Sequence, residues 1–310
     1  MISAKEFINL LIERPRFFLD TCMKRIEFLF PDKMYLSIRY YLRLGRVMHW
    51  NNPVLYQEKL QWLKLNNKKE IFTRMVDKVA VKDIVAEKIG PQYVIPTLGV
   101  WDSFDEIDFD QLPDKFVLKS NRGGGNSSVI VCKDKSKLDK ADARKKLEMG
   151  LTDRMYRKTR EWPYKNIVPK ILAEQLLEDD SEMNADGMAD YKFTCFNGTA
   201  DNVMVCVDRQ SGNTKYYFFD KNWNVLPYDI SGKELPATFK LPKPACIDEM
   251  FEIAGKLSEG IPFLRVDLYC VNDRPYFGET TFYPASGLDE VLLPETEALF
   301  GSKIDLSIVK

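Results

Sequence analysis

Hydrophobic residues in the first 90 positions recur every three or four residues, which is the spacing of an amphipathic helix. The first such series consists of Phe18, Cys22, Ile26 and Leu29. Asn52 and Pro53 are typical of an N-cap and a first helical turn, so another helix is predicted to begin there. A further helix is predicted over residues 79–89, with Gly90 ending it. This part of the chain is therefore expected to be helical.

After residue 93 the pattern changes to short runs of β-branched and aromatic residues, separated by turn sequences such as Asn197-Gly198. Strands are predicted over residues 116–119, 129–132, 171–177, 191–196, 203–207, 216–219 and 263–271. Helical patterns intervene over residues 140–151 and 247–257. Strands that follow one another in this way indicate an α+β fold with antiparallel sheets rather than a doubly wound parallel fold.

The two strands predicted on either side of Asn272 carry the most informative polar residues. Counting away from the turn places Asp267 about opposite Glu279. Because strand side chains alternate, Arg265 shares the face of Asp267, and Thr281 shares the face of Glu279. One face of this hairpin is therefore predicted to gather two carboxylates, a guanidinium and a hydroxyl.

Carboxylates that face each other across a sheet repel unless a cation lies between them. Mg²⁺ prefers such oxygen ligands, keeps several waters and shares the rest of its shell with substrate phosphates. The first hypothesis is therefore a magnesium site. The alternative is that Arg265 alone neutralises both acids in a surface network, and the hairpin pattern does not decide between the two.

A glycine-rich loop lies between the predicted strands at 116–119 and 129–132. It contains Gly123, Gly124, Gly125, Asn126 and Ser127. Consecutive glycines let backbone amides approach a ligand closely, which favours a flap that covers phosphates. No Gly-Lys-Ser/Thr sequence and no helix follows, so the loop is not a Walker loop. A simple hairpin turn is the alternative.

Composition restricts the chemistry. The 310 residues include 45 Lys+Arg and 46 Asp+Glu, so no global positive field favours nucleic acid, and no nucleic-acid partner is expected. His49 is the only histidine, which excludes multi-histidine metal sites and a Ser/His/Asp triad elsewhere. The six cysteines form no Cys-x-x-Cys pair, which indicates reduced, buried thiols. Catalysis is expected to rest on carboxylates, lysines, arginines and backbone amides.

A cytoplasmic location is predicted, because no apolar run reaches the roughly 18 residues of a membrane span and residues 7–12 are too short for a secretory signal. The first 50 residues contain nine Lys+Arg against five Asp+Glu. A basic segment rich in Phe, Leu and Tyr fits peripheral contact with the inner face of an anionic membrane. Helices packed on the body with solvated basic faces are the alternative.

Together these features resemble the ATP-grasp superfamily, and the wider pattern resembles its TupA-like branch, which is associated with bacterial surface polysaccharide (teichuronopeptide-type) and capsule biosynthesis. The matching motifs are Glu58-Lys59-Leu60-Gln61-Trp62-Leu63, Asp77-Lys78-Val79-Ala80-Val81-Lys82, Phe116-Val117-Leu118-Lys119, Arg160-Glu161-Trp162-Pro163-Tyr164-Lys165-Asn166-Ile167, Asp190-Tyr191-Lys192-Phe193 and Gly278-Glu279-Thr280-Thr281-Phe282-Tyr283-Pro284. The resemblance implies an ATP-grasp fold, in which two α+β lobes grip ATP, with a helical N-terminal region. The implied parts are residues 1–92 (helical region), 93–172 (small lobe with the glycine flap) and 173–310 (large lobe with the metal and substrate site).

The resemblance also implies ATP and Mg²⁺ as cofactors and a set of residues that bind ATP. That set is Lys78, Lys119, Gly123, Gly124, Gly125, Asn126, Ser127, Glu174, Gln175, Leu177 and Asp190. Lys78 and Lys119 would contact phosphates from two sides of the nucleotide. The segment that begins at Glu174 would read the adenine edge, and Asp190 would bind the ribose hydroxyls. Ordinary surface charges are the alternative for both lysines.

By the same resemblance, Asp267 and Glu279 would be Mg²⁺ ligands, and Arg265 would stabilise the charge of the transferring phosphoryl group. Lys192 would meet the γ-phosphate or a substrate carboxylate, and a merely exposed strand lysine is the alternative. Many relatives carry asparagine where this chain has Thr281, whose hydroxyl is a weaker ligand for a second metal position.

Substrate binding is implied for Tyr283, Ser286 and Gly287, which would border the pocket for the acceptor carboxylate. Trp162 and Tyr164 combine flat apolar surfaces with polar tips, as sugar-stacking residues do. Core packing of these two aromatic residues is the alternative.

The resemblance implies an ADP-forming carboxylate-amine ligase that forms an amide through an acyl phosphate. Its partners would be a carboxylate-bearing sugar or glycan, such as a uronic acid of a surface polysaccharide or its precursor, and an amino acid or similar amine. One alternative is a nucleotide-sugar glycosyltransferase, for which Asp108-Phe109-Asp110 offers an Asp-x-Asp triplet. Another is a non-catalytic ATP-binding scaffold, for which Thr281 is the main argument.

Overall fold

The computed structural model describes residues 12–122, 127–179, 189–207, 214–236 and 238–309. Its α-helices are α2 (Pro15–Met23), α3 (Asp32–Leu44), α4 (Tyr56–Asn66), α5 (Glu70–Val76), α6 (Val81–Lys88), α7 (Lys140–Leu151), α8 (Met155–Thr159), α9 (Ile230–Lys233), α10 (Ile247–Ser258) and α11 (Pro294–Lys303). Its strands are β1 (Thr97–Trp101), β2 (Phe116–Ser120), β3 (Val129–Cys132), β4 (Ile171–Gln175), β5 (Asp190–Phe196), β6 (Thr199–Val207), β7 (Lys215–Phe219), β8 (Val225–Leu226), β9 (Phe263–Val271) and β10 (Arg274–Thr281).

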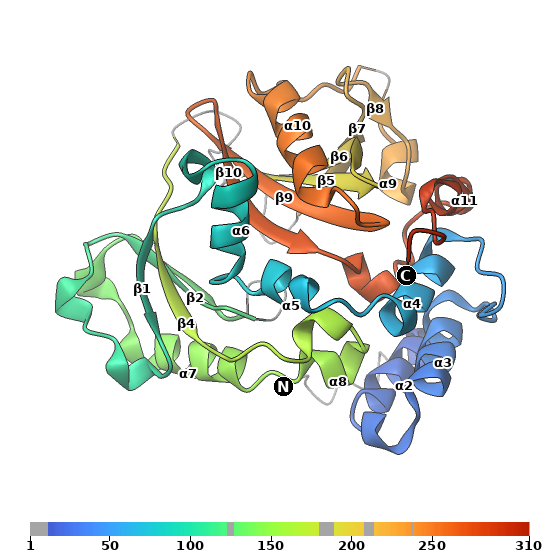
Figure 1. Cartoon of the computed structure of the whole chain (residues 1–310), viewed down its shortest axis with the longest axis horizontal. Coiled ribbons are helices and arrows are strands. Elements are labelled where there is room, and N and C mark those ends of the chain that lie inside the picture. Colours follow the sequence, from blue (N-terminus) through green and yellow to red (C-terminus); the bar gives the residue numbers. More distant parts are fainter. Residues whose placement is uncertain (1–11, 123–126, 180–188, 208–213, 237, 310) are drawn as a thin grey trace.

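The strands form two antiparallel sheets (Figure 1). The smaller sheet has four strands in the order β1-β4-β2-β3, and the larger has six in the order β10-β9-β5-β6-β7-β8. The chain leaves the smaller sheet after β4 and enters the larger one at β5. The prediction of an α+β fold with antiparallel sheets is therefore confirmed.

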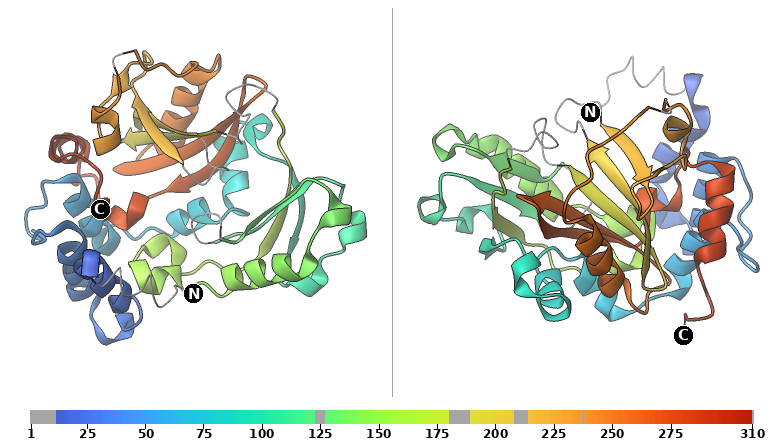
Figure 2. Two further views of the ribbon diagram at one scale, coloured as in Figure 1. Left: turned by 180° about the vertical axis from the view of Figure 1, so that it is seen from behind. Right: turned by 90° about the horizontal axis from the view of Figure 1, so that it is seen from above.

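Helices cover both sheets and complete two hydrophobic cores. The helix α7 packs on β2 and β3, and its Leu147 is fully buried with Phe116 and Leu118 of β2. The helix α10 packs on β5, β6 and β9 and buries Met250 and Ala254 against them. Helices α5 and α6 lie between the two sheets, as the view from behind also shows (Figure 2). The larger core thus joins the six-stranded sheet to helices from the first third of the chain.

The N-terminal region is helical, as predicted, and a buried ion pair ties its first two helices together. Arg39 of α3 donates to Asp20 of α2 with an Nε–Oδ1 distance of 2.6 Å, and both side chains are almost completely buried. The helix α3 also contacts α4. No helix in the described part of the chain is long and apolar enough to cross a membrane.

The start of α4 differs from the prediction at Asn52. The helix begins at Tyr56, because the Glu58 carboxylate accepts hydrogen bonds from the backbone N–H groups of Val54 and Leu55, at 2.9 and 3.1 Å. A side chain from the first turn of the helix therefore caps it, so the N-cap prediction for Asn52 and Pro53 is wrong. All seven strands predicted from the sequence are present, whereas β1 and β8 were not predicted.

The cysteines fit the predicted reduced state. All six are free thiols, and five of them are buried. Cys246 and Cys270 lie with their Sγ atoms 3.2 Å apart in the larger core, as the one close cysteine contact among the described side chains.

Candidate functional site

The hairpin of β9 and β10 brings the polar residues of both strands onto one face. Its turn residues Asn272 and Asp273 have φ values of 51° and 55°, a left-handed conformation that asparagine and aspartate tolerate. Asp267 pairs with Glu279 across the hairpin, which confirms the predicted register. The pairing shifts by one residue at Gly278, where β10 carries a bulge.

Asp267 is the buried centre of this face, with 3% of its surface exposed. Arg265 donates two hydrogen bonds to it, from Nε to Oδ1 at 2.7 Å and from Nη2 to Oδ2 at 2.8 Å. Lys192, which pairs with Asp267 from the neighbouring strand β5, donates to Oδ2 as well. Lys192 also lies 3.5 Å from the Asp190 carboxylate. Two cations thus hold one carboxylate in place.

Burial alone would raise the pKa of Asp267, but the charges of Arg265 and Lys192 outweigh it and hold that pKa below its ordinary value. Burial would lower the pKa of Arg265, and the Asp267 carboxylate raises it instead. Asp267 is therefore ionised near neutral pH, and the guanidinium stays charged beside it.

Glu279 completes the group from β10 and is the most open member, with 34% of its side chain exposed. Its carboxylate lies 3.9 Å from Nη2 of Arg265 and 3.6 Å from Nζ of Lys78. We call Lys78, Lys192, Arg265, Asp267 and Glu279 the hairpin cluster. Arg265 therefore contacts both acids, as the surface-network alternative requires. It does not neutralise them alone, however, because Lys192 also pairs with Asp267 and Lys78 also pairs with Glu279.

Lys78 reaches the hairpin from the loop between α5 and α6. Hydrogen bonds that join Asp77 and Lys78 of that loop to Asn121 hold the loop in place. Asn121 follows β2, is fully buried, and donates from Nδ2 to Asp77 Oδ1 at 3.0 Å. The backbone N–H of Lys78 donates to the Asn121 carbonyl at 3.0 Å. Asp77 and Asn121 were not predicted as site residues, although Asp77 belongs to one of the matching motifs.

A second ionic group lies on the smaller sheet. Glu174 of β4 is 4% exposed and forms ion pairs with Lys119 of β2 and with Lys82 of α6, the latter at 2.6 Å. Burial would raise the pKa of Glu174, but the two lysines hold it below its ordinary value. Lys82 belongs to the Asp77–Lys82 motif but had no predicted role. Its contact with Glu174 depends on how α6 packs against the sheet, which no local pattern reveals.

The remaining predicted nucleotide residues are only partly described. Gly123, Gly124, Gly125 and Asn126 lie outside the described residues, and Ser127 is exposed in a turn. Gln175 is exposed at the end of β4, and its backbone N–H donates to the Pro96 carbonyl at 3.0 Å. Leu177 is half-buried two residues further on.

The predicted substrate residues gather near the end of β10. Tyr283 and Gly287 are buried and Ser286 is half-buried, in the turn that follows the strand. Tyr164 packs against the larger core, as the core-packing alternative for this residue predicted. Burial, together with the nearby Glu161 and Glu279 carboxylates, raises the pKa of Tyr164. Lys68 and Lys165 lie 5.4 and 4.8 Å from the ring centroid of Trp162.

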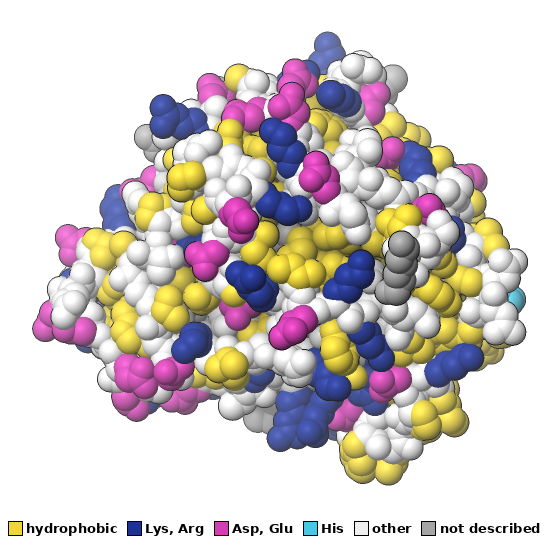
Figure 3. All heavy atoms as spheres, in the orientation of Figure 1, with side chains coloured by type: hydrophobic (Ala, Val, Ile, Leu, Met, Phe, Trp, Pro, Cys, Tyr) yellow, Lys and Arg dark blue, Asp and Glu magenta, His cyan; other side chains and the backbone are white. Residues whose placement is uncertain are grey.

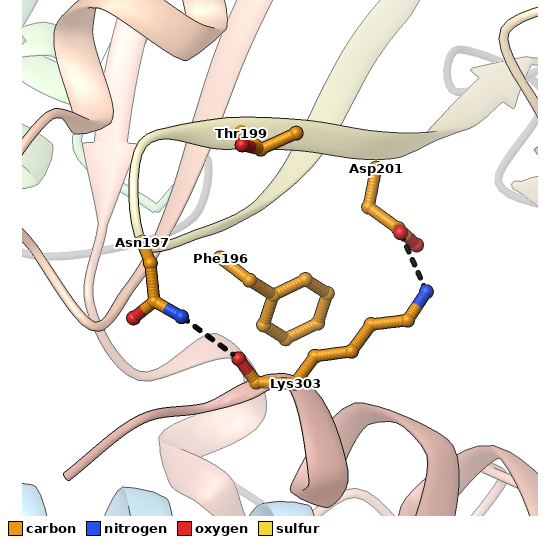
Figure 4. Close-up of a pocket in the computed structure, with 5 residues that line it drawn as sticks. All are labelled: Phe196, Asn197, Thr199, Asp201 and Lys303. Carbon is orange, nitrogen blue, oxygen red and sulfur yellow. Dashed lines mark hydrogen bonds and ion pairs between the residues drawn. The ribbon is translucent and has the colours of Figure 1, made fainter.

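Two other polar features have local partners. Asp108 accepts hydrogen bonds from the Asp110 backbone and the Gln111 side chain, so the Asp-x-Asp triplet caps a short helical turn. A hollow beside Phe196 is lined by Asp201 and Lys303, which form an ion pair with each other (Figure 4). None of the predicted site residues lines this hollow.

These two antiparallel sheets and their helices form an ATP-grasp fold. The family model described as TupA-like ATPgrasp matches residues 58–305, so the chain belongs to the TupA-like ATP-grasp family. Proteins of the ATP-grasp superfamily use ATP and Mg²⁺. No curated protein sequence matches the chain closely enough to count as a relative.

Solved structures show weak similarity to the chain. A D-alanine–D-alanine ligase from Bacillus anthracis complexed with ATP is 16% identical with a TM-score of 0.41, and the match covers 76% of this chain and 63% of that one. The D-cycloserine synthetase DcsG is 14% identical with a TM-score of 0.42, covering 76% and 71%. The ATP-grasp ligase PsnB with its minimal precursor is 12% identical with a TM-score of 0.37, covering 80% and 68%. Similarities of this size support no conclusion about substrates.

The residues present fit ATP and Mg²⁺. A carboxylate has about four lone-pair sites, and the three contacts that Asp267 receives leave it room for a metal. Glu279, directly opposite, is partly open. No group of three or more His, Cys, Asp or Glu among the described residues could hold a metal alone. Mg²⁺ is commonly bound by one or two carboxylates together with substrate phosphates, so this pair suffices.

Gly278→Ala tests the close approach of the two strands. A Cβ atom at this position would lie 3.0 Å from the Asp267 carbonyl oxygen and 3.1 Å from the Tyr269 ring. We expect the free energy of unfolding to fall by about 1–3 kcal/mol, as in overpacked cores, and ADP release from ATP to fall with it. Denaturant unfolding and an ADP assay measure the two effects.

Gly260→Ala is the control, because a Cβ atom at Gly260 would have no other atom within 4 Å, while the φ of this residue is +73°. Its left-handed backbone should cost about 1 kcal/mol without a loss of ADP release. Equal activity in both variants would show that the bulge does not set the geometry of the carboxylates.

Proposed function

We propose that this protein is an ADP-forming, Mg-ATP-dependent carboxylate-amine ligase. One observation carries the proposal: the hairpin cluster places three cations around two facing carboxylates. The carboxylates lie on the β9–β10 hairpin, and Lys78 reaches them from the loop between α5 and α6. Such a group holds a metal through its acids and phosphate oxygens through its cations. It suits phosphoryl transfer better than the surface-network alternative, because Asp267, the acid at its centre, is almost completely buried.

We assign each residue a role consistent with its contacts. Asp267 and Glu279 hold Mg²⁺, and Thr281, which accepts a hydrogen bond from Arg265 at 3.1 Å, borders the second metal position. Arg265 and Lys192 bind oxygens of the transferring phosphoryl group. Bound Mg-ATP supplies that group to the acceptor carboxylate, giving an acyl phosphate from which an amine displaces phosphate.

The nucleotide is proposed to lie between the two ionic groups. Lys78 and Lys119 bind its phosphates, and Lys82 holds Glu174 beside the adenine-reading segment that includes Gln175 and Leu177. Asp190, on β5 next to Lys192, takes the ribose hydroxyls. Residues 123–127 cover the phosphates.

The proposed acceptor is a uronic acid of a surface polysaccharide or its precursor, and the amine is an amino acid or a similar compound. Support comes from the turn at Tyr283, Ser286 and Gly287, and from Trp162, which follows Glu161, the residue that accepts a hydrogen bond from the Ser286 hydroxyl. Mass spectrometry of the polysaccharide repeat, from cells with the protein and from cells lacking it, tests the assignment. A mass difference equal to an amide-linked amine is expected, and identical repeats would contradict it.

A non-catalytic ATP-binding scaffold is the second candidate. It is favoured by Thr281, whose hydroxyl already accepts a hydrogen bond from Arg265 and is a weaker ligand than an amide oxygen. ATP binding without ADP release, in the presence of a broad panel of carboxylates and amines, would favour the scaffold over the ligase.

We also propose that the protein is cytoplasmic and that its N-terminal helices contact the inner face of an anionic membrane. Apolar side chains gather at the end of the α2–α3 pair, at the lower right of Figure 3. Around the short turn between these helices, Phe28 is 72% and Leu29 62% exposed. Lys24, Arg25 and Lys33 lie close to them in the sequence. Apolar tips with basic neighbours are typical of peripheral membrane contact.

Sedimentation with vesicles rich in anionic phospholipid tests this contact. The double variant Phe28→Glu/Leu29→Glu should weaken binding at least about tenfold, because it replaces two apolar side chains with charges of the lipid's sign. Met149→Glu, on the exposed face of α7, should bind as the unaltered protein does. Equal sedimentation of all three would mean that these basic faces are merely solvated.

A further inference from the structure

A buried lysine outside the hairpin cluster links the N-terminal region to the predicted substrate turn. Lys64 of α4 has no exposed surface. Its Nζ atom donates to the Thr159 carbonyl at 3.0 Å, to the Ser286 carbonyl at 2.9 Å and to the Ser286 hydroxyl at 3.2 Å. An ammonium group has three donors, and each has an acceptor here. The contacts of Lys64 therefore leave it no donor for a substrate.

Glu161 holds the same hydroxyl from the other side. It is 2% exposed, and its Oε1 accepts a hydrogen bond from the Ser286 hydroxyl at 2.8 Å. Burial lowers the pKa of Lys64 to about 7 and raises the pKa of Glu161, each opposed by the charge of the other. Because Ser286 accepts from Lys64 and donates to Glu161, the orientation of its hydroxyl is fixed.

The turn that carries Ser286 is strained. Ala285 and Ser286 have φ values of 48° and 59°, a left-handed conformation that non-glycine residues adopt at a cost in free energy. Gln61, one turn before Lys64 on α4, donates to the Ser286 and Gly287 carbonyls at 3.0 and 2.7 Å. Strain of this kind persists only where the surroundings impose it, and it is common at ligand sites.

The segment that supplies Glu161 is itself held by the first helices. The Lys158 carbonyl accepts from the Tyr35 hydroxyl at 2.8 Å and from Arg39 Nη1 at 2.7 Å. Arg160, at a φ of 58°, donates to the Glu27 carbonyl at 2.7 Å. The same segment leads to Tyr164, whose environment includes both Glu161 and Glu279. The N-terminal helices and the strained turn, which follows β10 in the chain, are therefore joined by one continuous set of contacts.

We propose that Lys64 and Glu161 are positioning residues for the acceptor site: they fix the hydroxyl and the strained turn of Ser286, so that the N-terminal helical region forms one wall of the site for a carboxylate-bearing acceptor. The nature of the acceptor rests on the proposed function. The claim that Lys64 and Glu161 fix the Ser286 turn does not rest on the proposed function. Two measurements therefore test the fixing of the turn and the binding of the acceptor separately.

The first measurement is amide hydrogen exchange of Lys64→Met. We expect the peptides covering residues 158–161 and 283–288 to exchange at least tenfold faster than in the unaltered protein. Lys59→Met is the matched control: it lies on the same helix, and its Nζ donates to the Ile304 carbonyl at 2.7 Å instead. Gln61→Ala, which keeps the buried charge, should loosen only residues 283–288 and guards against a folding defect in Lys64→Met. Unchanged exchange of both peptides in Lys64→Met would overturn the proposal, whether or not the protein is a ligase.

The second measurement is steady-state kinetics of ADP release. Lys64→Met and Ser286→Ala are each expected to raise KM for the acceptor at least tenfold and KM for ATP less than twofold. The double variant should raise the acceptor KM by less than the product of the single effects, because Lys64 acts through Ser286. Equal shifts of both KM values would reduce Lys64 to a structural role and overturn the proposal. If the unaltered protein releases no ADP with any acceptor, the proposed function fails, and the exchange data alone decide the positioning of the turn.

Discussion

Glu279→Gln is expected to lower acceptor-dependent ADP release by about 100- to 1000-fold, the scale of losing one group that stabilises transition-state charge. The substitution keeps the shape of the side chain and removes its negative charge. Because Glu279 is 34% exposed and its nearest cations are 3.6 and 3.9 Å away, the free energy of unfolding should change by less than about 1 kcal/mol. An ADP assay and denaturant unfolding measure the two quantities.

Glu148→Gln is the matched control. Glu148 also pairs with an arginine, at 3.3 Å on the exposed face of α7, far from the hairpin in the sequence. Its activity and stability should match those of the unaltered protein. Full activity of Glu279→Gln would show that Glu279 is not a metal ligand. The ion pairs of the hairpin would then be only a surface network.

Arg39→Met is expected to produce the largest loss of stability, about 3–5 kcal/mol, because it leaves the buried Asp20 carboxylate without its main partner. The two side chains are 2% and 1% exposed. The substitution also removes the hydrogen bond from Arg39 to the Lys158 carbonyl. Denaturant unfolding at pH 7 measures the loss. Arg144→Met, which breaks the exposed pair with Asp105, should leave the free energy of unfolding almost unchanged.

The pH dependence gives the same prediction a second test. Burial would raise the pKa of Asp20, but Arg39 holds it below the ordinary value of 3.8. A lowered pKa stabilises the folded state above the ordinary value, and this contribution is lost as the pH falls through the folded-state pKa. The difference between Arg39→Met and the unaltered protein should therefore shrink on acidification below about pH 4. A constant difference would mean that the loss comes from packing and not from charge.

Local patterns predicted most of the strands and the facing of Asp267 and Glu279. A strand alternates its side chains with a period of two, so the turn at Asn272 fixes the pairing as far as Phe277. The bulge at Gly278 then shifts the pairing by one residue and brings Glu279 opposite Asp267. The strand β1 was missed because its residues 97–101 lie mostly exposed and include Gly99, so no alternation marks it. Its strand conformation comes from pairing with β4, which is distant in the sequence.

The contacts missed from the sequence join elements that are far apart in the chain. Lys82 and Lys64 are ordinary lysines on predicted or partly predicted helices, and nothing nearby shows that they meet Glu174 and Ser286. Such contacts depend on how helices pack on the sheets. The family resemblance named residues within the motifs, but it assigned no role to Lys64 or Glu161.

The central claim is that a carboxylate is activated with ATP and then joined to an amine, and oxygen labelling tests it most directly. The acceptor is prepared with ¹⁸O in its carboxylate and incubated with the protein, the amine, ATP and Mg²⁺. If an acyl phosphate forms, one labelled oxygen leaves with the released phosphate, and mass spectrometry should find the label in phosphate and in the amide product. Amide product together with unlabelled phosphate, or ATP consumption without any amide, would contradict the account.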